Sequence, residues 1–158
     1  MKKKTLVLFL GNSLFSDDRI GLELGDRLKE RLQKKGYEVE VTEKSGLTLL
    51  DHMEKSNEVI IVDSIRTMKH PVGMVLTPSI EEFDTLSVFS PHYAGIPETL
   101  KILKALDLNP NCSIQIVAIE VEDPYTVSAE LGEKLKGKVD ELEQEVYKKI
   151  TQLCRTKP

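Results

Sequence analysis

The feature that most constrains the fold is the alternation of short apolar runs with longer segments of helical periodicity. Apolar runs occupy residues 5–10, 59–62 and 113–119. The second run is continuous, as expected of a strand buried on both faces of a parallel sheet. Apolar residues recur every three or four positions over residues 20–32 and 131–153, which predicts amphipathic helices. Because strands alternate with helices, we expect an α/β protein, a three-layer α/β/α sandwich with a mainly parallel twisted sheet of about five strands.

Three segments with less distinct patterns complete the expected order of structural elements. Residues 37–42 alternate between apolar and polar, which predicts a strand with one face less buried than its neighbours. Residues 73–76 predict a short strand that follows its predecessor too closely for a helical crossover, which favours antiparallel pairing. Residues 79–85 are polar and predict irregular structure. The length of 158 residues suits one domain with one core, so we expect residues 1–158 to form a single domain.

The composition argues against several classes of function. The formal net charge of -4 argues against nucleic acid as a main partner, because phosphate binding requires a basic face. No apolar run approaches the ~20 residues of a membrane span, and the one after the N-terminal lysines is too short for a signal-peptide core. Cys112 and Cys154 belong to no Cys-x-x-Cys pair, which favours reduced thiols. We therefore expect a cytoplasmic protein without a membrane partner, and we also expect it to be a monomer.

The loop after the first apolar run carries the strongest functional signal. A turn at Gly11 and Asn12 is followed by two adjacent acids, Asp17 and Asp18, at the start of a helical pattern. One of these acids can begin the helix, since Asp is a preferred N-cap residue and complements the helix dipole. The other is expected to have a chemical task, because adjacent carboxylates repel each other unless a cation or proton lies between them. The loop lacks the glycine spacing of nucleotide-binding loops, and its charge suits a cation.

Two other chemistry-bearing residues are expected near this loop. Asp63 ends the apolar run at 59–62 and would emerge at the carboxyl edge of the sheet. His92 stands before a helical pattern over residues 96–106 that returns across the sheet. Two carboxylates and an imidazole suit a borderline divalent metal such as zinc or nickel, with a position left open for water or substrate.

Each of these residues also has a purely structural interpretation. Asp63 can be a strand-end turn residue hydrogen-bonded to Thr67, and His92 can be a helix-entry residue fixed by Pro91. His52 and His70 have sequence neighbours typical of surface residues, so we expect them to lie on the surface. Neither residue alone indicates a metal site. The expected placement of both Asp63 and His92 beside the acidic loop favours one.

The motifs together carry a family resemblance. The chain resembles the hydrogenase maturation endopeptidases, which remove the C-terminal extension of a nickel-containing hydrogenase large subunit after metal insertion. The resemblance spans nearly the whole chain and rests on Gly11-Asn12-x-Leu14-x-x-Asp17-Asp18-x-x-Gly21, on Asp63, on Ser90-Pro91-His92 with Gly95, and on Ile119-Glu120 before Pro124.

The resemblance implies a site, a metal and a partner. Asp18, Asp63 and His92 would bind the metal, and the partner would be the large-subunit precursor, which itself supplies the nickel. Zinc or cadmium would substitute for nickel. Asp17 and Asp18 are the expected catalytic residues, with Asp17 orienting a metal-bound water or supporting Asp18.

The sequence departs from the family pattern at two positions and leaves two other functions open. Phe9 stands where members usually carry glycine, and residues 43–46 replace an Asp-Gly-Gly-Thr loop. A nickel-sensing or metallochaperone-like binding protein would use the same three ligands without cleavage. A phosphoacceptor receiver domain fits less well, because six residues separate Leu10 from Asp17 and no lysine ends the strand at 113–119.

Overall fold

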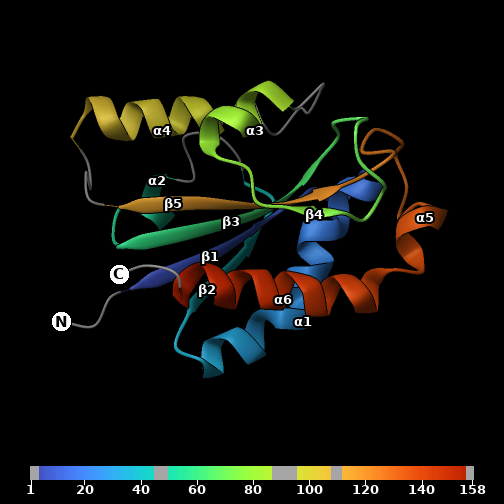
Figure 1. The fold of residues 1–158 in the computed structure, drawn as a ribbon, viewed down its shortest axis with the longest axis horizontal. Helices are drawn as coiled ribbons and strands as arrows, with labels where there is room; N and C mark the ends of the chain where they lie inside the picture. The colour runs from blue at the N-terminus through green and yellow to red at the C-terminus, as the bar shows by residue number, and fades with distance from the viewer. Residues whose placement is uncertain (1–3, 45–49, 87–95, 108–111, 156–158) are drawn as a thin grey trace.

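The protein forms a five-stranded sheet covered on both faces by helices (Figure 1). The computed structural model describes residues 4–44, 50–86, 96–107 and 112–155. In the strand order β2-β1-β3-β5-β4, all neighbouring pairs are parallel except β4 with β5, which is antiparallel. The strands are β1 (Thr5–Leu10), β2 (Glu38–Thr42), β3 (Glu58–Ile65), β4 (Val75–Leu76) and β5 (Ser113–Glu120). The predicted α/β class, the mainly parallel sheet and the antiparallel fourth strand are confirmed.

The helices form the two outer layers. On one face lie α1 (Ile20–Lys34) and α6 (Val139–Arg155), and on the other lie α2 (Leu50–Met53), α3 (Ile80–Leu86) and α4 (Ile96–Ala105). Two shorter helices, η1 (Asp17–Arg19) and α5 (Glu133–Lys136), precede α1 and α6. Among the helices that the structure describes, none is long and apolar enough to cross a membrane.

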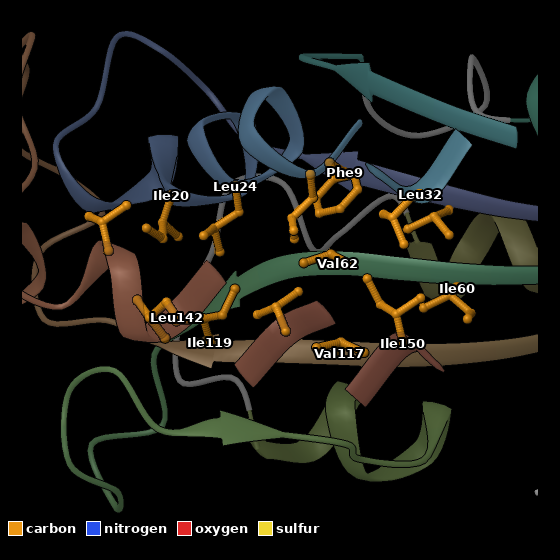
Figure 2. Packing of buried hydrophobic residues seen from close by; sticks show 14 of the residues in the cluster. Phe9, Ile20, Leu24, Leu32, Ile60, Val62, Val117, Ile119, Leu142 and Ile150 are labelled. Atoms are coloured by element: carbon orange, nitrogen blue, oxygen red, sulfur yellow. The ribbon is translucent and has the colours of Figure 1, made fainter. Parts of the chain in front are cut away.

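The larger part of the core lies between the sheet and the pair α1 and α6. Leu24, Leu28 and Leu32 recur at helical spacing on α1 and are fully buried, as the periodicity predicts. Figure 2 shows these helices packed on the inner strands through side chains that include Phe9, Leu24, Val62, Val117 and Ile150. A second cluster on the opposite face joins the sheet to α2, α3 and α4 through side chains such as Met53, Phe83 and Leu103.

Phe9, which replaces the glycine usual in the resembling family, is accommodated by a glycine on the facing helix. Its side chain is fully buried between β1 and α1. A Cβ atom built on Gly25 of α1 would lie 2.9 Å from the Cβ and Cγ atoms of Phe9. The aromatic ring therefore occupies space that only a glycine at position 25 leaves open. The core accommodates Phe9 in this way.

Two expectations from the sequence were wrong. Residues 79–85 are not irregular, because α3 begins at Ile80, with Ser79 Oγ accepting a hydrogen bond from the Glu82 amide at 3.1 Å and Phe83 buried beneath it. The third strand does not end at Asp63 but continues to Ile65, paired with β5. The β1–β3 ladder, however, ends at the pair Phe9 and Val62, so Asp63 is the first residue of β3 beyond that ladder.

Candidate active site

Glycines fold the loop after β1 tightly against the start of α1. A Cβ atom on Gly21 would lie 1.9 Å from the carbonyl oxygen of Leu10, and one on Gly11 would lie 2.6 Å from that of Asp18. Neither position has room for a side chain. The close approach places η1, which contains Asp17 and Asp18, directly beside the carboxyl end of β1.

The carboxylate of Asp17 binds the backbone of the loop that follows β5. Its Oδ2 accepts hydrogen bonds from the amides of Glu122 (3.1 Å) and Asp123 (2.7 Å), and its Oδ1 accepts one from Gly132 (2.9 Å). The Asp17 amide in turn donates to the Asp123 carbonyl at 2.9 Å. These hydrogen bonds hold residues 122–132 against the start of η1. The carboxylate itself is buried and contacts main-chain amides.

Asp18 and Asp63, predicted to lie together, are joined by Ser64. The Ser64 hydroxyl donates to Asp18 Oδ1 at 2.7 Å, and the Ser64 amide donates to Asp63 Oδ1 at 2.8 Å. All three residues are buried. The structure therefore brings two of the three predicted metal ligands to one point at the carboxyl edge of the sheet, while His92 lies outside the described residues.

The electrostatics of this pair favour a positive charge between the two acids. Burial raises the pKa of Asp63 well above its usual range, the charge of Asp18 raises it further, and the Ser64 amide partly opposes both effects. Asp63 Oδ2 is buried and accepts no hydrogen bond from the part of the chain that the structure describes. A buried carboxylate oxygen without a donor is costly unless a proton or a cation neutralises it. The carboxylate oxygens of Asp18 and Asp63 are therefore suitable ligands for a divalent cation.

The described residues hold only part of such a centre. Within residues 4–44, 50–86, 96–107 and 112–155, no three His, Cys, Asp or Glu side chains gather closely enough to bind a metal ion. A third ligand would have to come from the substrate or from a residue outside these ranges. His92, the predicted third ligand, is such a residue.

Sequence reasoning assigned no role to Ser64, Glu120 or Arg19, although Glu120 belongs to a motif that carries the resemblance. Ser64 directly follows Asp63, and a hydroxyl next to a predicted ligand is the signal that could have indicated it. Glu120 is buried at the end of β5 and accepts hydrogen bonds from the amide (2.8 Å) and the hydroxyl of Thr67. Thr67 is therefore the partner of Glu120, and the structural interpretation that paired it with Asp63 was wrong. Arg19 donates to the carbonyl oxygens of two loops, and no local pattern indicates this.

Comparison with known proteins places the chain in a family. The family model HycI, hydrogenase maturation protease, matches residues 22–149, a region that contains Asp63 and begins just after Asp18. The hydrogenase 2 maturation protease of Escherichia coli (strain K12) is 31% identical over 105 residues, which cover 64% of this chain and 63% of that protein. The aligned segment thus spans less than two thirds of that relative's length.

Solved structures show the same fold. The chain is similar to the NiFe hydrogenase maturation protease HybD from Thermococcus kodakarensis, with 28% identity, a TM-score of 0.69, and 92% of this chain and 97% of that chain covered. The hydrogenase maturating endopeptidase HybD from E. coli, at 22% identity, has a TM-score of 0.74 over 94% and 93% of the two chains, which shows a common fold. Since the family model matches most of the sequence and the fold agrees, the chain belongs to the hydrogenase maturation protease family.

Proposed function

We propose that the protein is an endopeptidase that removes the C-terminal extension of a hydrogenase large-subunit precursor once nickel has been inserted. The observation that carries this proposal is the buried pair Asp18 and Asp63, joined through Ser64 at the carboxyl edge of the sheet. Ligands and reaction centres gather at this edge in parallel α/β folds. Family membership supports the reaction class.

In this proposal the nickel belongs to the substrate, and the enzyme supplies ligands to it. Asp18, Asp63 and His92 complete a coordination sphere begun by the precursor, with zinc or cadmium able to replace nickel. When bound, the metal polarises the scissile carbonyl or lowers the pKa of a water molecule. Because the site gains its cation from the precursor, a precursor without nickel would be held poorly and left uncut.

The protein's own residues have separate tasks in this reaction. Asp63 would bind the cation as a carboxylate, since the positive charge offsets burial and the neighbouring Asp18, both of which raise the pKa of Asp63 in the metal-free protein. Ser64 fixes the orientation of Asp18 through its hydroxyl. Asp17 acts as a positioning residue, because its oxygens bind main-chain amides and hold the loop at 122–132 next to Asp18.

Metal titration and cleavage together test the proposal. We expect calorimetry to show weak binding of Ni²⁺, Zn²⁺ or Cd²⁺ that weakens in each of the variants Asp18→Ala, Asp63→Ala and His92→Ala. His52→Ala serves as the control and should bind as the wild type does. Mass spectrometry should show trimming of the nickel-loaded precursor by the wild type and none by Asp18→Ala. Equal metal affinity in all variants would contradict the three-ligand site.

We further propose that the enzyme acts as a monomer in the cytoplasm. Sedimentation velocity checks the first part, since the monomer has a mass of 17.8 kDa. Fractionation of the source cells, with the precursor as marker, checks the second. A dimer at working concentration, or a protein found outside the cytoplasm, would contradict this assignment.

A further inference from the structure

Two buried acids lie at opposite ends of the strand pair β3 and β5. Glu58 is the first residue of β3 and is 2% exposed, and Glu120 is the last residue of β5 and is 1% exposed. The two strands run side by side from the pair Glu58 and Ser113 to the pair Ile65 and Glu120 (Figure 1). Burying a carboxylate is costly unless it is hydrogen-bonded, so its partners matter. Of the two acids, Glu120 lies at the edge of the sheet that carries Asp63.

The carboxylate of Glu120 binds one residue of the turn that follows β3. Its Oε2 accepts a hydrogen bond from the Thr67 amide at 2.8 Å, and its Oε1 accepts one from the Thr67 hydroxyl. The hydroxyl oxygen of Thr67 in turn accepts a hydrogen bond from the Lys69 amide at 3.0 Å. Thr67 is as deeply buried as Glu120, so both bonds between them are shielded from water. We call this pair of bonds the Glu120–Thr67 clamp.

The turn held by the clamp has a backbone conformation that is unfavourable by itself. Met68 has a φ of 63°, in the left-handed region that residues with a side chain rarely adopt. The Met68 side chain is 68% exposed, so its own packing does not impose this conformation. A strained residue keeps its conformation where the surrounding structure fixes it. The hydrogen bonds of Thr67 and Lys69, the residues on either side, are contacts of this kind.

The end of β3 that carries the candidate site is paired with a strand on one side only. Its ladder with β1 ends at Val62, whereas its ladder with β5 continues through Asp63 and Ser64 to Ile65. On the side of β1 it contacts η1 instead, where the Ser64 hydroxyl donates to Asp18. Strand ends with fewer bonds open more readily than the interior of a sheet. The clamp lies two residues beyond Ile65, so it holds the far end of this stretch.

We propose that Glu120 is a positioning residue for the metal site, because it holds the end of β3, and with it Asp63, in place through Thr67. Glu120 binds Thr67 and acts on Asp63 through the backbone between them. Site residues have to be held within about 0.5 Å of their working geometry, which a strand end that opens and closes does not provide. This inference rests on the proposed function, since it takes Asp18 and Asp63 to be ligands of the metal.

Three variants separate this role from a contribution to stability alone. Glu120→Ala removes the clamp. Glu120→Gln is the conservative variant, because its amide oxygen can accept the Thr67 amide and its NH₂ group can donate to the Thr67 hydroxyl oxygen. The matched control is Glu58→Ala. Glu58 is also a buried acid of this strand pair and also binds across it, since its Oε1 accepts a hydrogen bond from Gln115 Nε2 at 3.2 Å, but it lies at the end away from Asp63.

Two measurements are made under conditions in which urea unfolding shows each variant to be folded. Calorimetry with Zn²⁺ measures the affinity of the site for metal. Native-state hydrogen exchange, followed by NMR in the metal-free protein, measures the opening of the Ser64 amide, which donates to Asp63 Oδ1. The exchange rate of Ser64 is divided by that of the Leu24 amide, because Leu24 is buried in α1 and its exchange reports overall unfolding.

We expect Glu120→Ala to weaken Zn²⁺ binding about tenfold and to raise the relative exchange rate of Ser64 about tenfold. Glu120→Gln should stay within about threefold of the wild type in both measurements. Glu58→Ala should match the wild type in both, although it unfolds at a lower urea concentration. Unchanged Zn²⁺ affinity in folded Glu120→Ala would overturn the positioning role, as would equal losses of affinity in Glu120→Ala and Glu58→Ala.

Thr67→Val keeps the test decisive if Glu120→Ala does not fold. It removes the hydroxyl arm of the clamp and keeps the amide arm, so we expect it to weaken Zn²⁺ binding about threefold, and an affinity equal to that of the wild type would overturn the role. A wild type that binds no Zn²⁺ would overturn it together with the metal site. A wild type that binds Zn²⁺ but never trims the nickel-loaded precursor would refute the proposed function, while the variants would still decide on Glu120.

Discussion

Replacing Asp63 by asparagine should stabilise the metal-free protein at neutral pH. The burial of Asp63 and the nearby charge of Asp18 both disfavour ionisation of Asp63. Asparagine keeps the shape and an oxygen that can accept the Ser64 amide, and it carries no charge to be buried beside Asp18. Leaving a buried polar group unsatisfied costs about 1–3 kcal/mol, so we expect Asp63→Asn, which removes the ionisable group, to raise the free energy of unfolding by about that amount at pH 7.5.

The sign of the pH dependence follows from the direction of the shift. The pKa of Asp63 is raised in the folded state, so the folded protein keeps a proton that the unfolded chain has already released. The free energy of unfolding therefore falls as pH rises from the ordinary aspartate value towards the folded pKa, by at most about 1.4 kcal/mol per pH unit. This loss is absent in Asp63→Asn. The advantage of the variant should thus shrink as pH is lowered towards 4.5.

Urea unfolding followed by circular dichroism, in the presence of a chelator and between pH 4.5 and 8, measures this difference. Asp26→Asn is the matched control, since Asp26 is exposed on α1 and should leave the pH profile unchanged. Added Zn²⁺ should stabilise the wild type and not Asp63→Asn. The reasoning fails if Asp63→Asn is less stable than the wild type at pH 8, or if the difference between the two proteins is constant across this pH range.

Three further predictions concern the loop, the serine and the histidine. Gly21→Ala should lower the free energy of unfolding, measured with urea, by at least about 3 kcal/mol, because the new Cβ would clash with the carbonyl oxygen at the end of β1. Gly137→Ala is the control and should change stability little, because its Cβ meets no atom within 4 Å. Ser64→Ala should weaken Zn²⁺ binding about tenfold in calorimetry, because it removes the hydrogen bond that orients Asp18, and an unchanged affinity would exclude that role. Zn²⁺ affinity should fall below about pH 6, since His92 must be neutral to bind metal, and a flat profile from about pH 7.5 to 5.5 would remove His92 from the site.

The fold could be predicted from the sequence because its signals are local. The continuous apolar run at residues 59–62 indicates a central strand, and the spacing of Leu24, Leu28 and Leu32 indicates a helix with one buried face. Parallel strands end at a common edge, so the order of strands and helices along the chain was enough to predict that Asp18 and Asp63 lie near each other. The segment at 79–85 was misread because a short helix needs few apolar side chains: Phe83 is buried, and Ile80 and Leu86 pack against the same cluster.

The details of the site depend on contacts that no local pattern records. The three amides that bind Asp17 come from residues more than 100 positions away, and they are main-chain groups that every residue except proline carries. The choice of Glu120 as the partner of Thr67 depends on how β3 and β5 are aligned. Whether a carboxylate lacks a hydrogen bond, as Asp63 Oδ2 does among the described residues, becomes visible only once the core around it is packed.

The central claim, that cleavage reports nickel insertion, is tested most directly by offering the enzyme two preparations of one precursor. One preparation is loaded with nickel and the other is free of metal, and mass spectrometry of the large subunit follows the loss of the C-terminal extension. The account predicts trimming of the nickel-loaded precursor alone, even with the enzyme in excess, and no inhibition by serine- or cysteine-protease inhibitors. Trimming of the nickel-free precursor at a comparable rate would contradict it.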